Sequence, residues 1–155
     1  MRKRKATKRP VEPDIKYDNA SIGRFINYLM EDGKKTVAQK VVYDALDIAA
    51  KKIKKEPIEI FTTAIENASP VYEVVSRRVG GANYQVPREV RNERKFFLAC
   101  HWIIDGAQST KGRPMAQKLA EELIAAFNNE GNAIRKKQNV HKMAESNRAF
   151  AHFAR

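Results

Sequence analysis

Arginine is the residue type whose spacing most clearly predicts chemistry in this sequence. A guanidinium binds phosphate through two parallel hydrogen bonds and stacks on bases, and glycines allow a backbone to approach closely. Tyr84, next to the glycines, could stack on an unpaired base or pack across a strand pair, and both interpretations stay open. The segment of residues 77–94, which holds five arginines around a pair of glycines, therefore predicts a surface that binds a polyanion. Its arginines, which flank Gly80 and Gly81, are Arg77, Arg78, Arg88, Arg91 and Arg94.

Lysine dominates most of the other basic stretches, where only positive charge is required. Any one such stretch could be a solvated surface, but the acids lie mainly in other segments, and this segregation of charge favours a binding surface. The residues are Arg2, Lys3, Arg4, Lys5, Lys8 and Arg9 in the N-terminal arm, Lys52 and Lys55 in "KKIKK", Lys95 after the arginine segment, Lys111 and Arg113 in "STKGRP", and Arg135, Lys136, Lys137 and Lys142 near the C-terminal end.

The composition agrees with a polyanionic partner. The chain has 155 residues, 30 Lys and Arg against 18 Asp and Glu, and a net charge of +12. Nucleic acid is the leading candidate, because we find no amphipathic basic helix whose apolar face is left for a membrane. The length and the 43 % hydrophobic content predict one domain, residues 1–155, with a real core. The single cysteine excludes an intrachain disulfide and favours a reduced, cytosolic compartment.

No residue constellation predicts an enzyme, a cofactor or a metal site. Cys100 and His101 are neighbours on an expected helix and point about 100° apart, so they do not form a nucleophile pair. Cys100 is expected to be buried, since it shares the apolar stripe of that helix. The histidines lack the spacing of metal ligands, and "TKGRP" lacks the frame of a phosphate-binding loop.

The elements that must position the basic residues are mostly helices. Apolar residues recur at helical spacing in "SIGRFINYLM", as Ile22, Phe25, Ile26 and Leu29. Similar patterns predict helices over residues 20–30, 35–54, 57–69, 92–107 and 114–129 and from about residue 132 onward, with Gly131 ending the fifth. Residues 1–14 are expected to form an extended, flexible basic arm.

Residues 71–91 break the helical pattern. Valines and tyrosines favour strand on both sides of Gly80-Gly81-Ala82-Asn83, whose residues accept positive φ, so a β-hairpin is predicted between the third and fourth helices. Pro87 lacks a donor, so its strand cannot be central in a sheet. The base can pack on helices, but the tip lacks an apolar face, and a lone two-stranded ribbon is marginal in water. The missing partner of the tip is predicted to be a polyanion.

Four stretches of the chain match one known family, in the same order. They are "FINYLMEDGKKT" (25–36), "VVYDALDIAA" (41–50), "VSRRVGGANYQVPREVR" (75–91) and "MAESNRAFAHF" (143–153). The chain resembles the small-subunit ribosomal protein S-seven family of bacterial type, and the hairpin stretch is the most specific match. The N-terminal arm departs from the family's usual sequence, and Asn83 stands where Ser or Thr is common.

The resemblance implies a fold and a place in the cytoplasmic ribosome. The fold would be six helices with one protruding hairpin, and the protein would bind the 3′ major domain of small-subunit ribosomal RNA and nucleate assembly of the subunit head. The decoding centre would lie nearby, and the hairpin tip would lie beside exit-site transfer RNA and messenger RNA. The small-subunit proteins S-nine and S-eleven would be neighbours.

The resemblance also carries over to individual positions. Arg77, Arg78, Gly80, Gly81, Tyr84 and Arg88 match the hairpin motif, and Lys34 and Lys35 match the "DGKK" turn. The tip that would lie near transfer RNA and messenger RNA comprises Gly80, Gly81, Ala82, Asn83 and Tyr84. Our hypothesis is a non-enzymatic ribosomal RNA-binding protein. The alternative is an architectural DNA-binding protein with a basic β-ribbon, which would favour an apolar or proline wedge at the ribbon tip.

Overall fold

The computed structural model describes residues 11–154, and within them helices predominate. The prediction of a mainly helical fold with one hairpin between the third and fourth helices is confirmed. Of the N-terminal arm, the predicted RNA-binding residues Arg2, Lys3, Arg4, Lys5, Lys8 and Arg9 lie outside the described residues. The elements are α1 (Ala20–Leu29), α2 (Lys35–Ile53), α3 (Pro57–Ala68), β1 (Tyr72–Val79), β2 (Ala82–Glu89), α4 (Asn92–Ser109), α5 (Met115–Phe127), α6 (Gly131–Ser146) and a 3₁₀ helix, η1 (Arg148–Ala154).

The helical body is held by one apolar core around α5, which contacts α2, α3, α4 and α6. Phe25 of α1 and Phe61 of α3 meet edge to face, with ring centroids 5.3 Å apart. Leu119 and Leu123 of α5 are fully buried. The helical periodicity of the sequence therefore identifies the residues that form the core. Cys100 is buried among them, as predicted.

Helix boundaries follow from capping residues in the sequence. The side chain of Asn19 accepts hydrogen bonds from the backbone amides of Ser21 and Ile22 at the start of α1. Pro57 begins α3, where its missing N–H is not needed. One boundary differs from our expectation: α5 ends at Phe127, and Gly131 is the first residue of α6 instead of the end of the fifth helix. Its φ of 93° explains why a glycine is found there.

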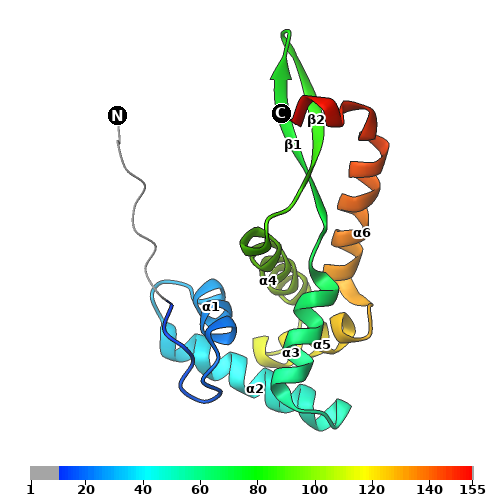
Figure 1. Ribbon diagram of the computed structural model, residues 1–155. Helices are drawn as coiled ribbons and strands as arrows, with labels where there is room; N and C mark the ends of the chain where they lie inside the picture. The colour runs from blue at the N-terminus through cyan, green and yellow to red at the C-terminus, as the bar shows by residue number, and fades with distance from the viewer. Residues whose placement is uncertain (1–10, 155) are drawn as a thin grey trace, which may run out of the picture.

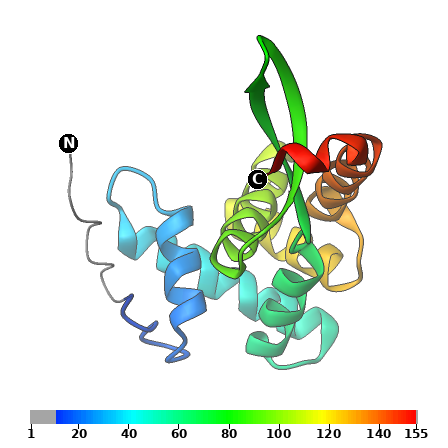
Figure 2. The same ribbon diagram turned by 45° about the horizontal axis from the view of Figure 1, so that its top comes forward.

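The hairpin pairs β1 with β2 in antiparallel register from Tyr72↔Glu89 to Val79↔Ala82. Gly80 and Gly81 make the turn with φ of 58° and 90°, a left-handed geometry that favours glycine at both positions. The strand pair projects from the helical body in both views (Figures 1 and 2). The predicted hairpin and its glycine tip are thus confirmed.

The chain returns to the hairpin at its C-terminal end. Helix α6 runs beside the strands, and η1 then crosses β2 (Figure 1). The expectation that only the base of the hairpin would find packing partners in the chain is therefore wrong. The reason is a long-range contact, because η1 begins 59 residues after the end of β2 in the sequence. None of the described helices is long and apolar enough to cross a membrane.

Candidate RNA-binding surface

The two arginines nearest the tip lie on opposite faces of the hairpin. Arg77 pairs with Tyr84 and Arg78 with Asn83, and adjacent residues of a strand point to opposite faces. The Arg77 guanidinium donates a hydrogen bond to the carbonyl of Phe153 in η1. Arg78 is exposed, and no residue of the described chain forms a hydrogen bond or ion pair with its side chain. Arg78 is therefore the tip arginine that is available to a partner.

Tyr84 packs on the C-terminal segment. Its ring centroid lies 5.1 Å from that of Phe150 and 5.3 Å from that of Phe153. The sequence left two interpretations open, base stacking and packing across the strands, and the structure adds a third contact that neither included. Phe150 and Phe153 were missed because η1 is too short to show periodicity. Their spacing of three residues, which puts two rings on one side of a helical turn, is the signal that could have found them.

The base of the hairpin holds a cluster of two arginines and one buried glutamate. Glu73 Oε1 accepts hydrogen bonds from Arg88 Nε at 3.0 Å and Nη2 at 2.7 Å, and Oε2 accepts one from Arg94 Nε at 3.3 Å. Burial acts to raise the pKa of Glu73, but the hydrogen bonds from Arg88 and Arg94 outweigh it and the pKa is lowered. The carboxylate is therefore ionised at neutral pH, and both arginines are partly neutralised.

Glu73 is the second feature that the sequence analysis missed, and a signal for it was present. With the turn at Gly80-Gly81, position 73 falls opposite position 88 in the hairpin register. An acid opposite a base is a stabilising cross-strand pair. The contact with Arg94 carries no such signal, because it depends on how α4 leaves the strand.

The start of α4, with the residue that precedes it, adds two further cations beside this cluster. The Arg91 carbonyl accepts backbone hydrogen bonds from Arg94 and Lys95 at 2.9 Å, so the turn is well formed. The Arg94 guanidinium lies 4.9 Å from the ring centroid of Phe97. The side chains of Arg91 and Lys95 have no hydrogen bond or ion pair within residues 11–154.

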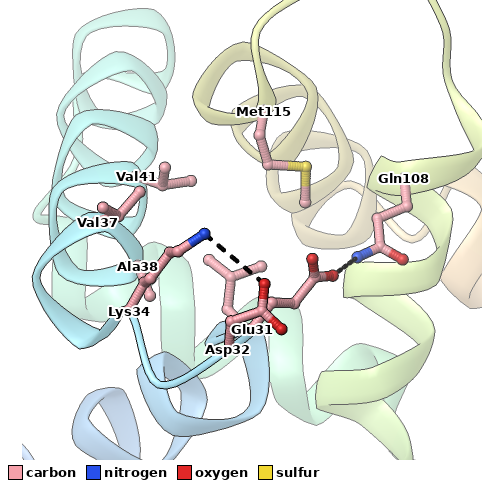
Figure 3. A pocket seen from close by; sticks show the side chains of 9 residues that line it. Glu31, Asp32, Lys34, Val37, Ala38, Val41, Gln108 and Met115 are labelled. Atoms are coloured by element: carbon pink, nitrogen blue, oxygen red, sulfur yellow. Dashed lines mark hydrogen bonds and ion pairs between the residues drawn. The ribbon is translucent and has the colours of Figure 1, made fainter.

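The "DGKK" turn borders a cavity of about 360 Å³ between α1, α2 and the α4–α5 connection (Figure 3). Its apolar lining includes Leu29, Val37 and Met115. Its rim is acidic: Lys34 Nζ lies 3.7 Å from Asp32 Oδ2, and Glu31 accepts a hydrogen bond from Gln108 at 3.4 Å. The positive charge of Lys34 is therefore partly compensated by Asp32.

Four more predicted residues divide between paired and unpaired cations. Arg113 forms an ion pair with Glu121. Lys55 pairs with Glu59 and lies 5.2 Å from the ring centroid of Phe127. Lys52 and Lys111, like Lys35, are exposed and have no ion-pair partner among the described residues.

On α6 one predicted RNA-binding lysine is used inside the protein. Lys137 Nζ donates to the carbonyl of Asn67 at 2.7 Å, which ties α6 to the end of α3. Burial lowers the pKa of Lys137. Arg135 and Lys142, seven residues apart and so on the same side of the helix, are exposed, as is Lys136. The four cations of α6 thus have unequal roles: three face outward and one joins helices.

His141 of α6 also contacts the hairpin. Its Nε2 accepts a hydrogen bond from the backbone amide of Val71 at 3.0 Å, and its ring meets Tyr72 edge to face. Burial, with a smaller effect of nearby Lys137, lowers the pKa of His141, which agrees with a neutral ring accepting this bond. His141 therefore fixes the base of β1 on α6.

A groove of about 640 Å³ lies between the hairpin and α6. Tyr72, Pro87 and Ala144 supply its apolar lining, and its charged residues balance: Arg88 and Arg148 against Glu89 and Glu145. Because it carries no excess of positive charge, we do not include the groove in the RNA-binding surface.

The predicted site residues thus fall into two groups. One group has partners within the protein, and the other is left unpaired and is available to a polyanion. The paired group is Lys34, Lys55, Arg77, Arg88, Arg94, Arg113 and Lys137. Within the described residues the unpaired group is Lys35, Lys52, Arg78, Arg91, Lys95, Lys111, Arg135, Lys136 and Lys142.

The described residues include no cluster of metal ligands, and their one cysteine is not activated. No group of three or more His, Cys, Asp or Glu in this part of the chain could hold a metal ion. Burial raises the pKa of the Cys100 thiol, which keeps it protonated and unreactive.

Comparisons with known proteins identify the family of this chain. Residues 1–148 match the family described as ribosomal protein S7p/S5e. The small ribosomal subunit protein uS7 of Thermotoga neapolitana is 55 % identical over 153 residues, which are 99 % of each chain. That of Thermosipho melanesiensis is 57 % identical over the same span, and that of Chloroflexus aggregans is 52 % identical over 96 % of this chain and 94 % of its own. The chain therefore belongs to the ribosomal protein S7p/S5e family.

Proposed function

We propose that this protein is a structural, non-enzymatic constituent of the small ribosomal subunit that binds ribosomal RNA. The observation that carries this function is the set of unpaired cations on the hairpin, the start of α4 and α6, in a chain of net charge +12. Family membership supports the same conclusion, since the relatives are small ribosomal subunit proteins. The site of action is the cytoplasmic ribosome.

The mechanism is electrostatic positioning by a rigid body. The apolar core around α5 fixes the directions of α4 and α6, and α6 in turn contacts the hairpin. The unpaired cations then neutralise phosphates at set distances, which holds RNA of one shape and excludes others. In this mechanism the whole chain, including the basic residues 1–10, works as one RNA-binding domain.

The finer assignment follows the hairpin motif. We assign the RNA target to the 3′ major domain of the small-subunit ribosomal RNA, where binding nucleates assembly of the subunit head near the decoding centre. The exposed tip, Gly80 to Asn83, would approach exit-site transfer RNA and messenger RNA. The neighbouring proteins would be S-nine and S-eleven. The support for these assignments is the close match of residues 75–91 to the family's hairpin.

The architectural DNA-binding alternative receives no support from the comparisons. Such a protein would insert an apolar or proline wedge between base steps. Here the tip is Gly-Gly-Ala-Asn, and Pro87 is buried six residues after Gly81, the last residue of the turn. The ribbon therefore lacks the feature that this function needs.

Binding measurements with two nucleic acids test the proposed function. We expect a head-domain RNA fragment to bind far more tightly than duplex DNA of similar length, whose non-specific dissociation constant should be about 10⁻⁴ to 10⁻⁶ M at physiological salt. If about six to ten phosphates are neutralised, affinity should fall by about 10³ to 10⁵ between about 50 and 200 mM salt. Equal affinity for both nucleic acids, or a nearly flat salt response, would contradict the proposal.

A further inference from the structure

Glu73 is the one acidic side chain on β1, and it is buried. It is 8 % exposed, whereas the residues after Val74 on the same strand are exposed as far as Arg78. Moving a carboxylate out of water costs several kcal/mol unless it is paired and hydrogen-bonded. An acid in this position also lowers the positive charge of an RNA-binding surface. Its presence therefore needs a reason beyond charge.

The contacts of Glu73 join three segments of the chain. Arg88 comes from the opposite strand, and Arg94 comes from the first turn of α4. One carboxylate accepts hydrogen bonds from both guanidiniums, at 2.7 to 3.3 Å. Two positively charged guanidiniums so near each other would repel in the absence of the acid. Glu73 is therefore what allows two arginines to converge at the base of the hairpin.

Each arginine keeps donors that Glu73 does not use. A guanidinium has five N–H groups. Arg88 uses Nε and Nη2, and Arg94 uses Nε alone. Their side chains remain 58 % and 48 % exposed. With two positive charges and one negative, the cluster keeps a net positive charge and has donors that solvent can reach.

We propose that Glu73 is a positioning residue for RNA binding, which orients Arg88 and Arg94 so that their remaining donors together bind one RNA phosphate at the base of the hairpin. This inference rests on the proposed function. It separates the base from the tip, where Arg78 binds without a carboxylate behind it. It also reverses the simple expectation from charge, since removing this acid would weaken binding to the cognate RNA.

The test compares two glutamates of the hairpin. Glu73→Gln and Glu89→Gln each raise the net charge by one, but the side chain of Glu89 is exposed and has no hydrogen bond or ion pair in the described chain. Both variants and the unmodified protein are titrated with the head-domain RNA fragment and with poly(U) of the same length. We expect Glu73→Gln to bind the fragment about tenfold or more weakly, and Glu89→Gln to bind it as well as or slightly better than the unmodified protein. If Glu73→Gln and Glu89→Gln bound the RNA fragment with equal affinity, the inference would be overturned.

Two readouts separate positioning from a merely structural role. The slope of log affinity against log salt should fall by about 0.7 to 0.9 in Glu73→Gln, the value for one lost phosphate contact, although its net charge has risen. In a protein that already carries Arg88→Gln and Arg94→Gln, the further change Glu73→Gln should have no effect on fragment binding. An unchanged slope, or a further loss in that background, would mean that Glu73 only supports the fold.

The same titrations distinguish the inference from the proposed function. If the unmodified protein binds poly(U) as tightly as the fragment, the proposed function fails. If it prefers the fragment but Glu73→Gln keeps that preference, only the role of Glu73 fails. Circular dichroism fixes a temperature at which all variants are folded. Should Glu73→Gln be unfolded at every temperature, Glu73→Asp and its matched control Glu89→Asp, neither of which changes the net charge, take the places of the two glutamine variants.

Discussion

The base of the hairpin and the junction of α5 with α6 each bury one glutamate, and the two carboxylates have opposite surroundings. Glu73 and Glu122 are both 8 % exposed. Glu73 is bonded by two arginines, which lower its pKa. Glu122 accepts a hydrogen bond from the backbone amide of Ala133 at 2.8 Å, and burial raises its pKa although this bond and the charge of Arg135 oppose the rise.

The difference shows what each region is built for. At the junction, the glycines make room for the carboxylate: a Cβ on Gly106 or Gly131 would come within 2.9 Å of Glu122 Oε1. Glu122 thus caps the start of α6 from within the helical body. At the hairpin base, the carboxylate instead gathers cations beside the solvent. The body uses its buried acid to fix a helix, and in our proposal the hairpin uses its own to hold positive charge for RNA.

The largest contrast between body and hairpin is expected in stability. Leu123→Ala in α5 removes a fully buried side chain and should cost about 2 to 5 kcal/mol of the free energy of unfolding. Val79→Ala near the tip, where the valine is half-buried, should cost less than about 1 kcal/mol. Urea denaturation followed by circular dichroism measures both. Similar costs for the two variants would show that the hairpin belongs to the same cooperative core.

The reverse contrast is expected in RNA binding. Arg77→Ala combined with Arg78→Ala should leave the helix content unchanged and weaken binding to the head-domain RNA at least about tenfold, since a charge-assisted hydrogen bond contributes about 1.5 to 3 kcal/mol. Arg24→Ala with Lys40→Ala removes the same charge from exposed positions of α1 and α2 and is the matched control. A matching loss of helix in the hairpin variant would mean that these arginines are structural.

These contrasts also show which parts of the molecule could be predicted from its sequence. The helices and the core could, because burial of one helical face produces the spacing seen at Ile22, Phe25 and Ile26. The hairpin could, because Gly80 and Gly81 are both in the left-handed conformation that its turn needs. The basic surface followed from charge, but charge alone did not tell paired cations from unpaired ones.

The remaining features depend on contacts between distant segments. Lys137 is bonded to Asn67, seventy residues earlier in the chain, and Tyr84 packs on Phe150 and Phe153. Such contacts are set by the path of α6 relative to the hairpin, and no local pattern encodes that path. The contacts of Glu73 can be predicted only in part. Its pairing with Arg88 follows from the strand register, whereas its contact with Arg94 does not.

The two glutamates should give stability opposite dependences on pH. Because the pKa of Glu73 is lowered from its ordinary 4.5, its contribution is present above that pH and is lost as the pH falls through the lowered value. Because the pKa of Glu122 is raised from the same ordinary value, its contribution is present below it and is lost as the pH rises through the raised value. The difference in free energy of unfolding from Glu73→Gln should therefore grow with pH, and that from Glu122→Gln should shrink.

Each change should be on the order of 1 kcal/mol between about pH 3 and 7. Denaturant titrations of the unmodified protein and of both variants across that range measure it. If the change in free energy of unfolding caused by each variant varied with pH in the same direction, the distinction between the two buried acids would be lost.

The smallest effect is expected where the hairpin meets η1. Tyr84→Ala removes the ring that contacts Phe150 and Phe153, which should cost about 0.5 to 1.5 kcal/mol. Amide hydrogen exchange should become faster in β1 and β2 and stay unchanged in α5. Tyr84→Phe keeps the ring and is the control. Faster exchange throughout the body would mean that the C-terminal segment supports the whole fold.

Lysine footprinting tests the central claim, that the unpaired lysines of the predicted surface bind RNA. The protein would be acetylated with and without the head-domain RNA fragment, and the modification of each lysine measured by mass spectrometry. We expect protection of Lys35, Lys95, Lys111, Lys136 and Lys142, which have no partner in the described chain, and no protection of Lys40, which is exposed on α2 outside the predicted surface. Protection of Lys40 equal to that of Lys95 and Lys142 would contradict the account.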